Sequence, residues 1–174
     1  MVGKALHVGR TSARGDGFVD EMHAARNDRW LTPLPLIRAL GSFDLDPCGA
    51  PDHPTANEIW TPEAVGDGLS MPWRGRVWLN PPYGRTMADW IRNLAEHGQG
   101  TALIFARTET ALFHDLVWPL ASAILFLRGR VTFLDPEGVA ASANSGAPSV
   151  LIAYGDDDAK RLAESGLEGH LVKL

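Results

Sequence analysis

The tetrapeptide Asn80-Pro81-Pro82-Tyr83 has the residue types of a site for a planar group that carries an amino nitrogen. The two prolines fix the backbone and remove two N–H donors, so the turn presents carbonyl oxygens. The Asn80 side chain adds a further carbonyl acceptor, and Tyr83 adds a flat aromatic face. A flipped, amino-bearing base needs acceptors and a stacking surface of this kind. The plainer alternative is a proline-rich turn with a packed tyrosine.

The elements around this motif indicate where it lies in the fold. Apolar segments alternate with segments of helical periodicity, which predicts an α/β fold with a mostly parallel sheet flanked by helices. We expect strands at 43–46, 58–61, 76–80, 101–106, 123–127, 131–134 and 150–154, with 127 and 131 joined by a hairpin around Gly129, and helices at 31–40, 86–96, 110–118 and 156–165. Ligands of such sheets bind beyond the carboxyl ends of strands. Asp46-Pro47-Cys48-Gly49 and the 80–83 motif should therefore open onto one crevice.

Length and composition predict one soluble domain. The chain has 174 residues with a net charge of −5, and we expect a flexible arm at 1–27 and a single domain at 28–174. No run approaches the length of a membrane span, no signal peptide is evident, and the single cysteine fits a reducing cytoplasm. The six histidines show no metal-ligand spacing, so no metal is expected. An acidic chain that binds DNA must either concentrate its positive charge locally or make only a brief contact.

Several further motifs occur in a fixed order along the chain, from Trp30 to Tyr154. They are Arg29-Trp30-Leu31-Thr32-Pro33, Phe43-Asp44-Leu45-Asp46-Pro47-Cys48, Asp67-Gly68-Leu69, Trp73, Leu79-Asn80-Pro81-Pro82-Tyr83-Gly84, Arg107-Thr108-Glu109-Thr110, Phe113-His114, Leu127-Arg128-Gly129-Arg130-Val131-Thr132-Phe133 and Pro148-Ser149. The ordered set resembles the phage-encoded DNA N6-adenine methyltransferases, often called phage Dam-like, which belong to the NPPY-type amino-methyltransferases. The resemblance implies a compact Rossmann-like fold, S-adenosylmethionine as cofactor, double-stranded DNA as partner, and a phage or prophage source in a bacterial host cell.

The resemblance also implies roles for individual residues. Catalysis would use Asn80, Pro81, Pro82 and Tyr83, with the Asn80 side-chain oxygen and the Pro81 carbonyl accepting the hydrogens of adenine N6. Cofactor binding would use Thr32, Pro33, Asp46, Pro47, Cys48, Asn57, Asp67, Leu69 and Asn80. The carboxylate of Asp46 would pair with the cofactor's ammonium. Most of these residues also have a plainer interpretation, such as a helix cap for Thr32 or a turn aspartate for Asp67.

Four residues are candidates for DNA contact. Arg107 and Thr108 end the strand that follows the 80–83 motif and would face the same crevice, although a salt bridge is the alternative for Arg107. Arg128 and Arg130 flank Gly129 in the expected hairpin, where phosphate contacts are plausible.

The chain departs from many methyltransferases, because Asp46-Pro47-Cys48-Gly49 stands where a Phe-x-Gly-x-Gly loop is common. The chain is also too short for a large inserted target-recognition domain. The 80–83 motif alone leaves cytosine N4, an RNA base or a protein glutamine open as substrates. A DNA- or cofactor-binding module without turnover is a further alternative. The oligomeric state, monomer or homodimer, is not determined by the sequence.

Overall fold

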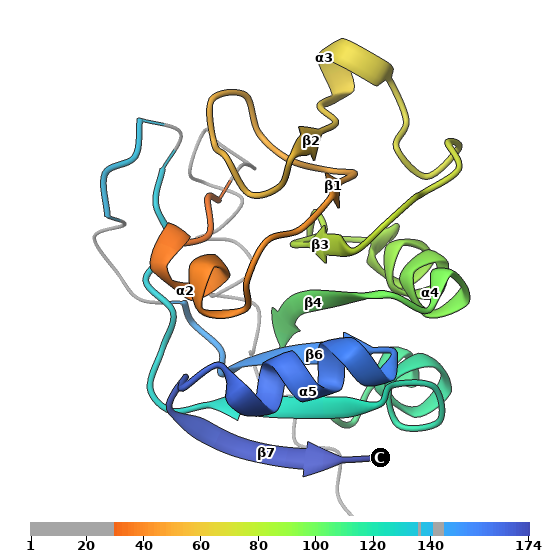
Figure 1. Cartoon of the computed structure of the whole chain (residues 1–174), viewed down its shortest axis with the longest axis vertical. Coiled ribbons are helices and arrows are strands. Elements are labelled where there is room, and N and C mark those ends of the chain that lie inside the picture. The colour runs from red at the N-terminus through yellow and green to blue at the C-terminus, as the bar shows by residue number, and fades with distance from the viewer. Residues whose placement is uncertain (1–29, 136, 141–144) are drawn as a thin grey trace, which may run out of the picture.

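A seven-stranded sheet organises the computed structural model, which describes residues 30–135, 137–140 and 145–174 (Figure 1). The spatial order of the strands is β2-β1-β3-β4-β6-β5-β7. The strands are β1 (Leu45–Asp46), β2 (Glu58–Ile59), β3 (Val77–Leu79), β4 (Gly100–Phe105), β5 (Ala123–Leu127), β6 (Ser149–Tyr154) and β7 (Gly169–Lys173). Strands β2, β1, β3 and β4 are parallel, whereas β6 is antiparallel to β4 and β5, and β7 is antiparallel to β5. The predicted α/β fold is confirmed.

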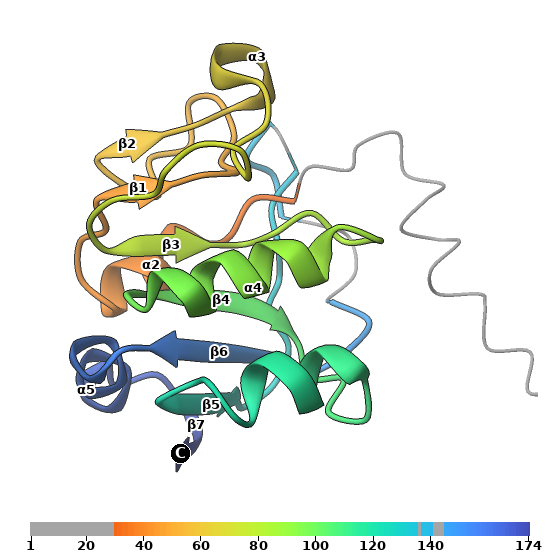
Figure 2. The ribbon, with the colours of Figure 1, turned by 90° about the vertical axis from the view of Figure 1, so that its right-hand side faces the viewer.

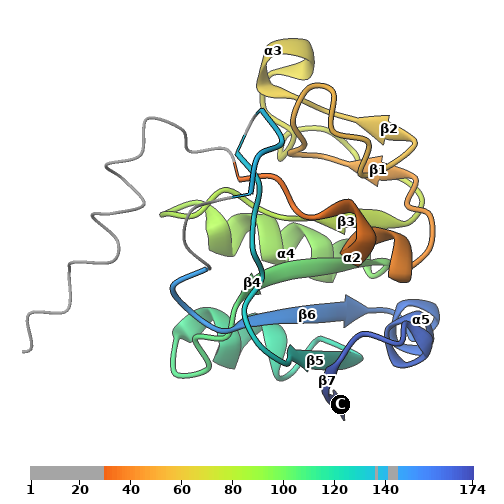
Figure 3. The same cartoon turned by 90° about the vertical axis from the view of Figure 1, so that its left-hand side faces the viewer.

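Helices and one extended segment cover the two faces of the sheet. The helical elements are α2 (Leu34–Ala39), α3 (Pro62–Val65), α4 (Met87–His97), the π-helix η1 (Phe113–Val117) and α5 (Asp156–Glu164). One face packs against α4 and η1 (Figure 2), and the other packs against α2, α5 and residues 131–133 (Figure 3). Strand β3 contributes to both cores, because Val77 and Leu79 point to the α4 side and Trp78 to the α2 side.

Helix α4 shows why the helical prediction succeeded. Its apolar residues Trp90, Ile91 and Leu94 recur at helical spacing and are buried against the sheet. Gly98 ends the helix in the left-handed conformation, at φ +73°. The helix begins at Met87, four residues after Tyr83, so its packing on the sheet anchors the chain that leaves the 80–83 turn.

Two expectations near the carboxyl half of the chain were wrong. Residues 131–134 are not a strand of the sheet, and Gly129 is not in a hairpin, because β5 pairs with β6 and β7. Val131 and Phe133 are buried on a face of the sheet instead, which explains their alternating pattern. Leu134 forms an isolated antiparallel bridge with Leu31. Strand β7 was not predicted.

The predicted arm at 1–27 lies outside the described residues. Within the described ranges, no helix has the length and apolar character needed to cross a bilayer.

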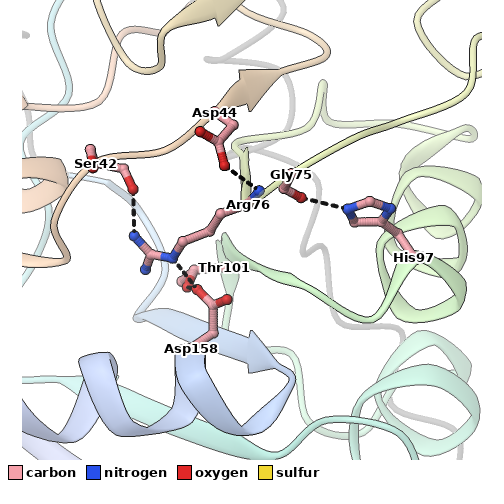
Figure 4. Close-up of polar contacts among 7 residues, drawn as sticks. All are labelled: Ser42, Asp44, Gly75, Arg76, His97, Thr101 and Asp158. Atoms are coloured by element: carbon pink, nitrogen blue, oxygen red, sulfur yellow. Dashed lines mark hydrogen bonds and ion pairs between the residues drawn. The ribbon is translucent and has the colours of Figure 1, made fainter.

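A buried ion pair joins α5 to the start of β3 (Figure 4). The Arg76 Nε donates to Asp158 Oδ1 at 2.8 Å, and both side chains are almost fully buried. The Thr101 hydroxyl donates to the same oxygen, and Arg76 Nη1 donates to the Ser42 carbonyl. The guanidinium carbon also lies 3.9 Å from the centre of the Phe43 ring. These contacts fix the amino end of the parallel strands, at the opposite edge of the sheet from the 80–83 turn.

Removing one partner of this ion pair should destabilise the fold. We expect Asp158→Ala to lower the free energy of unfolding by about 3 kcal/mol, because the Arg76 charge would stay buried without its counter-ion. Urea denaturation measures the change. Arg92→Ala is the control, because it breaks the half-exposed pair with Asp89 and should cost no more than about 0.5 kcal/mol. Equal losses in the two variants would contradict a stabilising role for the buried pair.

Candidate active site

A cavity of about 350 Å³ lies where the turns after β1 and β3 meet. It is lined by Trp30, Leu31, Thr32, Asp46, Pro47, Cys48, Gly49, Ala50, His53, Thr55, Pro62, Gly66, Asp67, Gly68, Trp78, Asn80, Pro81, Pro82, Tyr83 and Trp90. The two motifs that were expected to share a crevice thus line the same cavity. Its volume is within the range of small-molecule sites.

The Asn80 side chain is held by one end only. Its Nδ2 donates to the Trp30 carbonyl at 3.2 Å. Its Oδ1 is buried and has no hydrogen-bond partner among the described residues. A buried acceptor without a donor is costly, so this oxygen is available for a ligand that brings an N–H group.

The Tyr83 ring stacks on Phe105, the last residue of β4. The ring centroids are 4.5 Å apart and the planes are inclined by 25°. Burial raises the pKa of the Tyr83 phenol, and the positive charge of Arg107 opposes that rise. The phenol oxygen is buried, with no partner within the described ranges. Phe105 therefore fixes the orientation of the aromatic surface beside Asn80.

The Asp46 carboxylate is almost completely buried, with 3% of its surface exposed. One oxygen accepts a hydrogen bond from the Cys48 N–H, and the other accepts from the Thr55 hydroxyl. Burial raises the pKa of Asp46 to about 6, against the opposing effect of these hydrogen bonds. In the part of the chain that the structure describes, no cationic side chain pairs with it. The carboxylate is thus a buried anionic group beside the cavity with no protein counter-ion.

The comparisons with known proteins agree with this geometry. A family model described as DNA N-6-adenine-methyltransferase (Dam) matches residues 20–162. The chain belongs to this family. The search of curated proteins and the search of solved structures each found no match.

Other residues that were predicted to bind the cofactor of this Dam family member divide into two groups. Thr32, Pro47, Cys48 and Asp67 line the cavity, whereas Pro33, Asn57 and Leu69 do not. The Thr32 hydroxyl oxygen is buried without a partner among the described residues. Asn57 lies near the start of β1, where its Nδ2 approaches Asp44 at 3.5 Å.

Three residues of the predicted cofactor-binding set have contacts or positions that the structure explains. Pro33 precedes the first residue of α2, and the Leu69 N–H donates to Asp67 Oδ1. The Cys48 thiol donates to the Asn80 carbonyl at 3.4 Å, and burial raises the pKa of Cys48 well above its usual value. A thiol in this state is a poor nucleophile.

Several cavity residues were not predicted as site residues, among them His53, Thr55, Gly68 and Trp90. The Gly68 position has a clear steric reason, because a Cβ there would lie 2.1 Å from the Pro47 carbonyl oxygen. Helical periodicity had marked Trp90 as a core residue only. The loop positions His53 and Thr55 carried no signal.

The four predicted DNA-contact residues lie outside the cavity lining. Arg107 and Thr108 follow β4, and Arg107 is exposed and close enough to influence the Tyr83 phenol. Arg128 and Arg130 are also exposed, and Arg128 Nη1 lies 3.8 Å from Glu168 Oε2. Across the described ranges, no group of three histidine, cysteine or acidic residues could hold a metal ion.

The raised pKa of Asp46 predicts a pH-dependent stability difference. Ionised Asp46 destabilises the empty fold, because the carboxyl ionises more readily in the unfolded chain. We expect Asp46→Asn to increase the free energy of unfolding at pH 7.5 by about 3 kcal/mol at most. The asparagine could still accept from the Cys48 N–H and donate to the Thr55 hydroxyl.

The difference in the free energy of unfolding between Asp46→Asn and the wild type should shrink as the pH falls from 6 towards 4, where wild-type Asp46 becomes protonated. Urea denaturation of both chains at several pH values measures it. Asp67→Asn, at an exposed position on the same cavity, should change stability by less than about 0.5 kcal/mol. A pH-independent difference for Asp46→Asn would contradict the assignment.

Proposed function

We propose that this chain transfers a methyl group from S-adenosylmethionine to N6 of adenine in double-stranded DNA. The observation that carries the proposal is the buried Oδ1 of Asn80, which has no partner among the described residues and belongs to a residue that lines the cavity together with the stacked Tyr83. An exocyclic amino group supplies the N–H that this oxygen lacks. Membership of the DNA N-6-adenine-methyltransferase family supports the same substrate.

The cavity residues fit the charged end of the methyl donor. The donor's ammonium needs an anion, and the buried Asp46 carboxylate has no cationic partner in the described structure. The donor's carboxylate needs hydrogen-bond donors, and the Thr32 hydroxyl is unpartnered within the same cavity. Asp67 offers an exposed carboxylate for a ribose hydroxyl or an amino group. Gly68 packs so closely against the Pro47 carbonyl oxygen that no side chain would fit at this position of the cavity lining.

The chain's own residues would orient the acceptor. The Asn80 Oδ1 and the Pro81 carbonyl accept the two hydrogens of adenine N6, which directs the nitrogen lone pair away from them. S-adenosylmethionine would supply an electrophilic methyl group in exchange for one proton of the amino nitrogen, which would pass to solvent. Alignment and these fixed acceptors supply the rate gain.

Tyr83 and the basic residues would hold the DNA. The extruded base stacks on Tyr83, whose ring is already fixed by Phe105. Arg107 lies beside this ring and is exposed, so it is suited to a phosphate on the flanking strand. Arg128, Arg130 and Thr108 would extend this contact, because basic and hydroxyl side chains bind phosphate oxygens.

The decisive test is product analysis. Labelled S-adenosylmethionine and unmethylated duplex DNA should yield N6-methyladenine with the wild-type chain. Asn80→Ala should reduce the rate at least a hundredfold while it retains donor binding, because the acceptor oxygen is lost. Label in cytosine, RNA or protein would assign a different amino substrate. Donor binding without any product would indicate a binding module, and full activity of Asn80→Ala would overturn the mechanism.

Donor affinity should depend on the ionisation of Asp46. Ammonium binding requires the carboxylate, and the pKa of about 6 means that the empty site is largely protonated at pH 5. We expect affinity for S-adenosylmethionine to fall up to about tenfold per pH unit below 6. Calorimetry at pH 5, 6 and 7.5 measures it. Asp46→Asn should bind weakly throughout this range, and a wild-type affinity that stays flat would contradict the ion pair.

A further inference from the structure

The residues Trp30, Leu31 and Thr32, which we call the strap, line the cavity and are held by hydrogen bonds at three points. The Leu31 N–H donates to the Leu134 carbonyl at 2.9 Å, and the Leu134 N–H donates back to the Leu31 carbonyl at the same distance. His53 Nε2 lies 2.8 Å from the Thr32 carbonyl oxygen. A carbonyl only accepts, so this histidine nitrogen carries the hydrogen. The strap is therefore held by hydrogen bonds to two segments that are distant from it in the sequence.

The third contact joins the strap to the catalytic motif. The Trp30 carbonyl accepts the hydrogen bond from Asn80 Nδ2 at 3.2 Å. An amide has one donating end and one accepting end, and a backbone carbonyl can satisfy only the donating end. The contact therefore determines that Oδ1 faces the other way, where it has no partner among the described residues.

We propose that the Trp30 carbonyl is a positioning group that makes the site specific for asparagine, as opposed to aspartate, at position 80. The inference rests on the proposed function, since it concerns the acceptor that would bind adenine N6. An ionised carboxylate at this position has two acceptors and no donor. It would set an oxygen against the Trp30 carbonyl and lose the contact that orients the side chain. The strap thus acts on the reaction through Asn80 and does not touch the base.

A protonated carboxyl would restore the missing donor. Its O–H can donate to the Trp30 carbonyl while its C=O points in the direction of the wild-type Oδ1. The defect of Asn80→Asp should therefore titrate, and lower pH should repair it. The carboxyl would also share its cavity with the buried Asp46 carboxylate, which disfavours its ionisation.

Other titratable groups line or adjoin the same cavity in both chains. They are Asp46 at the end of β1, Cys48 just after it, His53 and Asp67 in the following loops, Tyr83 after β3 and Arg107 after β4. All of these groups are present in both the wild type and the variant. The ratio of variant to wild type at each pH therefore reports the carboxyl at position 80 together with Asp46, the group to which its ionisation is coupled.

The experiment compares wild type, Asn80→Asp and Asn80→Ala between pH 5.5 and 8.5. The first readout is the single-turnover methylation rate at saturating S-adenosylmethionine. The second is the melting temperature without DNA or donor. At pH 8.5, Asn80→Asp should be at least tenfold slower than wild type and should melt at a lower temperature. Both deficits should narrow towards pH 5.5, while those of the control Asn80→Ala stay constant.

Each outcome decides the matter. The positioning role is overturned if Asn80→Asp equals wild type at pH 8.5, or if its melting deficit does not change with pH. The melting temperature of Asn80→Asp could approach that of the wild type as the pH falls, while the wild type makes no N6-methyladenine. That result would refute the proposed function and support the Trp30 contact. Methylation by all three chains with pH-independent ratios would leave the proposed substrate standing and refute the positioning role.

Discussion

The parallel pairing of β1 with β3 is the constraint on which the site depends. Leu45 pairs with Val77, so both strands leave the sheet at the same edge, one at Asp46 and the other just before Asn80. The start of this pairing is reinforced by the Asp44 carboxylate, which accepts the Arg76 N–H at 2.8 Å. Among the described residues, a buried anion without a cationic partner and a buried amide oxygen without a hydrogen-bond donor thereby line the same cavity.

The two edges of the parallel strands consequently serve different purposes. At the amino edge, Arg76 pairs with Asp158 and Thr101 contributes a further hydrogen bond, although Arg76 Nη2 and Asp158 Oδ2 are buried without a partner among the described residues. At the carboxyl edge, the buried Asp46 carboxylate has no cationic partner and Asn80 Oδ1 has no hydrogen-bond partner in the same part of the chain. Unsatisfied groups of this kind destabilise an empty fold and are typical of functional sites.

Periodicity predicted the elements whose pattern reflects burial in the sheet or against it, such as β3, β4 and α4. It failed at residues 131–134, where Val131 and Phe133 alternate with polar or less buried positions as in a strand. Alternation reports that a segment is extended and buried on one side, but it does not report a hydrogen-bonded neighbour. Strand β7 was missed because its residues are exposed or only half-buried, which leaves no clear pattern.

The chemistry of the site was predictable where it depends on residue type. Side-chain type and position at or after the end of an apolar segment were enough to predict Asn80, Tyr83 and Asp46 as candidate site residues. The strap does not, because Trp30 acts through a backbone carbonyl that every residue possesses. Asn57, which was predicted to bind the cofactor, lies at the amino end of β1 and not at the end occupied by Asp46.

The hydrogen bonds of the strap also limit when the candidate site can form during translation. Asn80, the hydrogen-bond partner of Trp30, is 50 residues further along the chain. Leu31 cannot form its two hydrogen bonds until Leu134 has been synthesised. Until then, a nascent chain that already contains the whole 80–83 motif lacks the pairing that fixes the strap. Long-range contacts of this kind form late because their loop-closure entropy must be overcome first. The site is thus assembled by the carboxyl half of the chain, although most of its chemical groups are synthesised in the amino half.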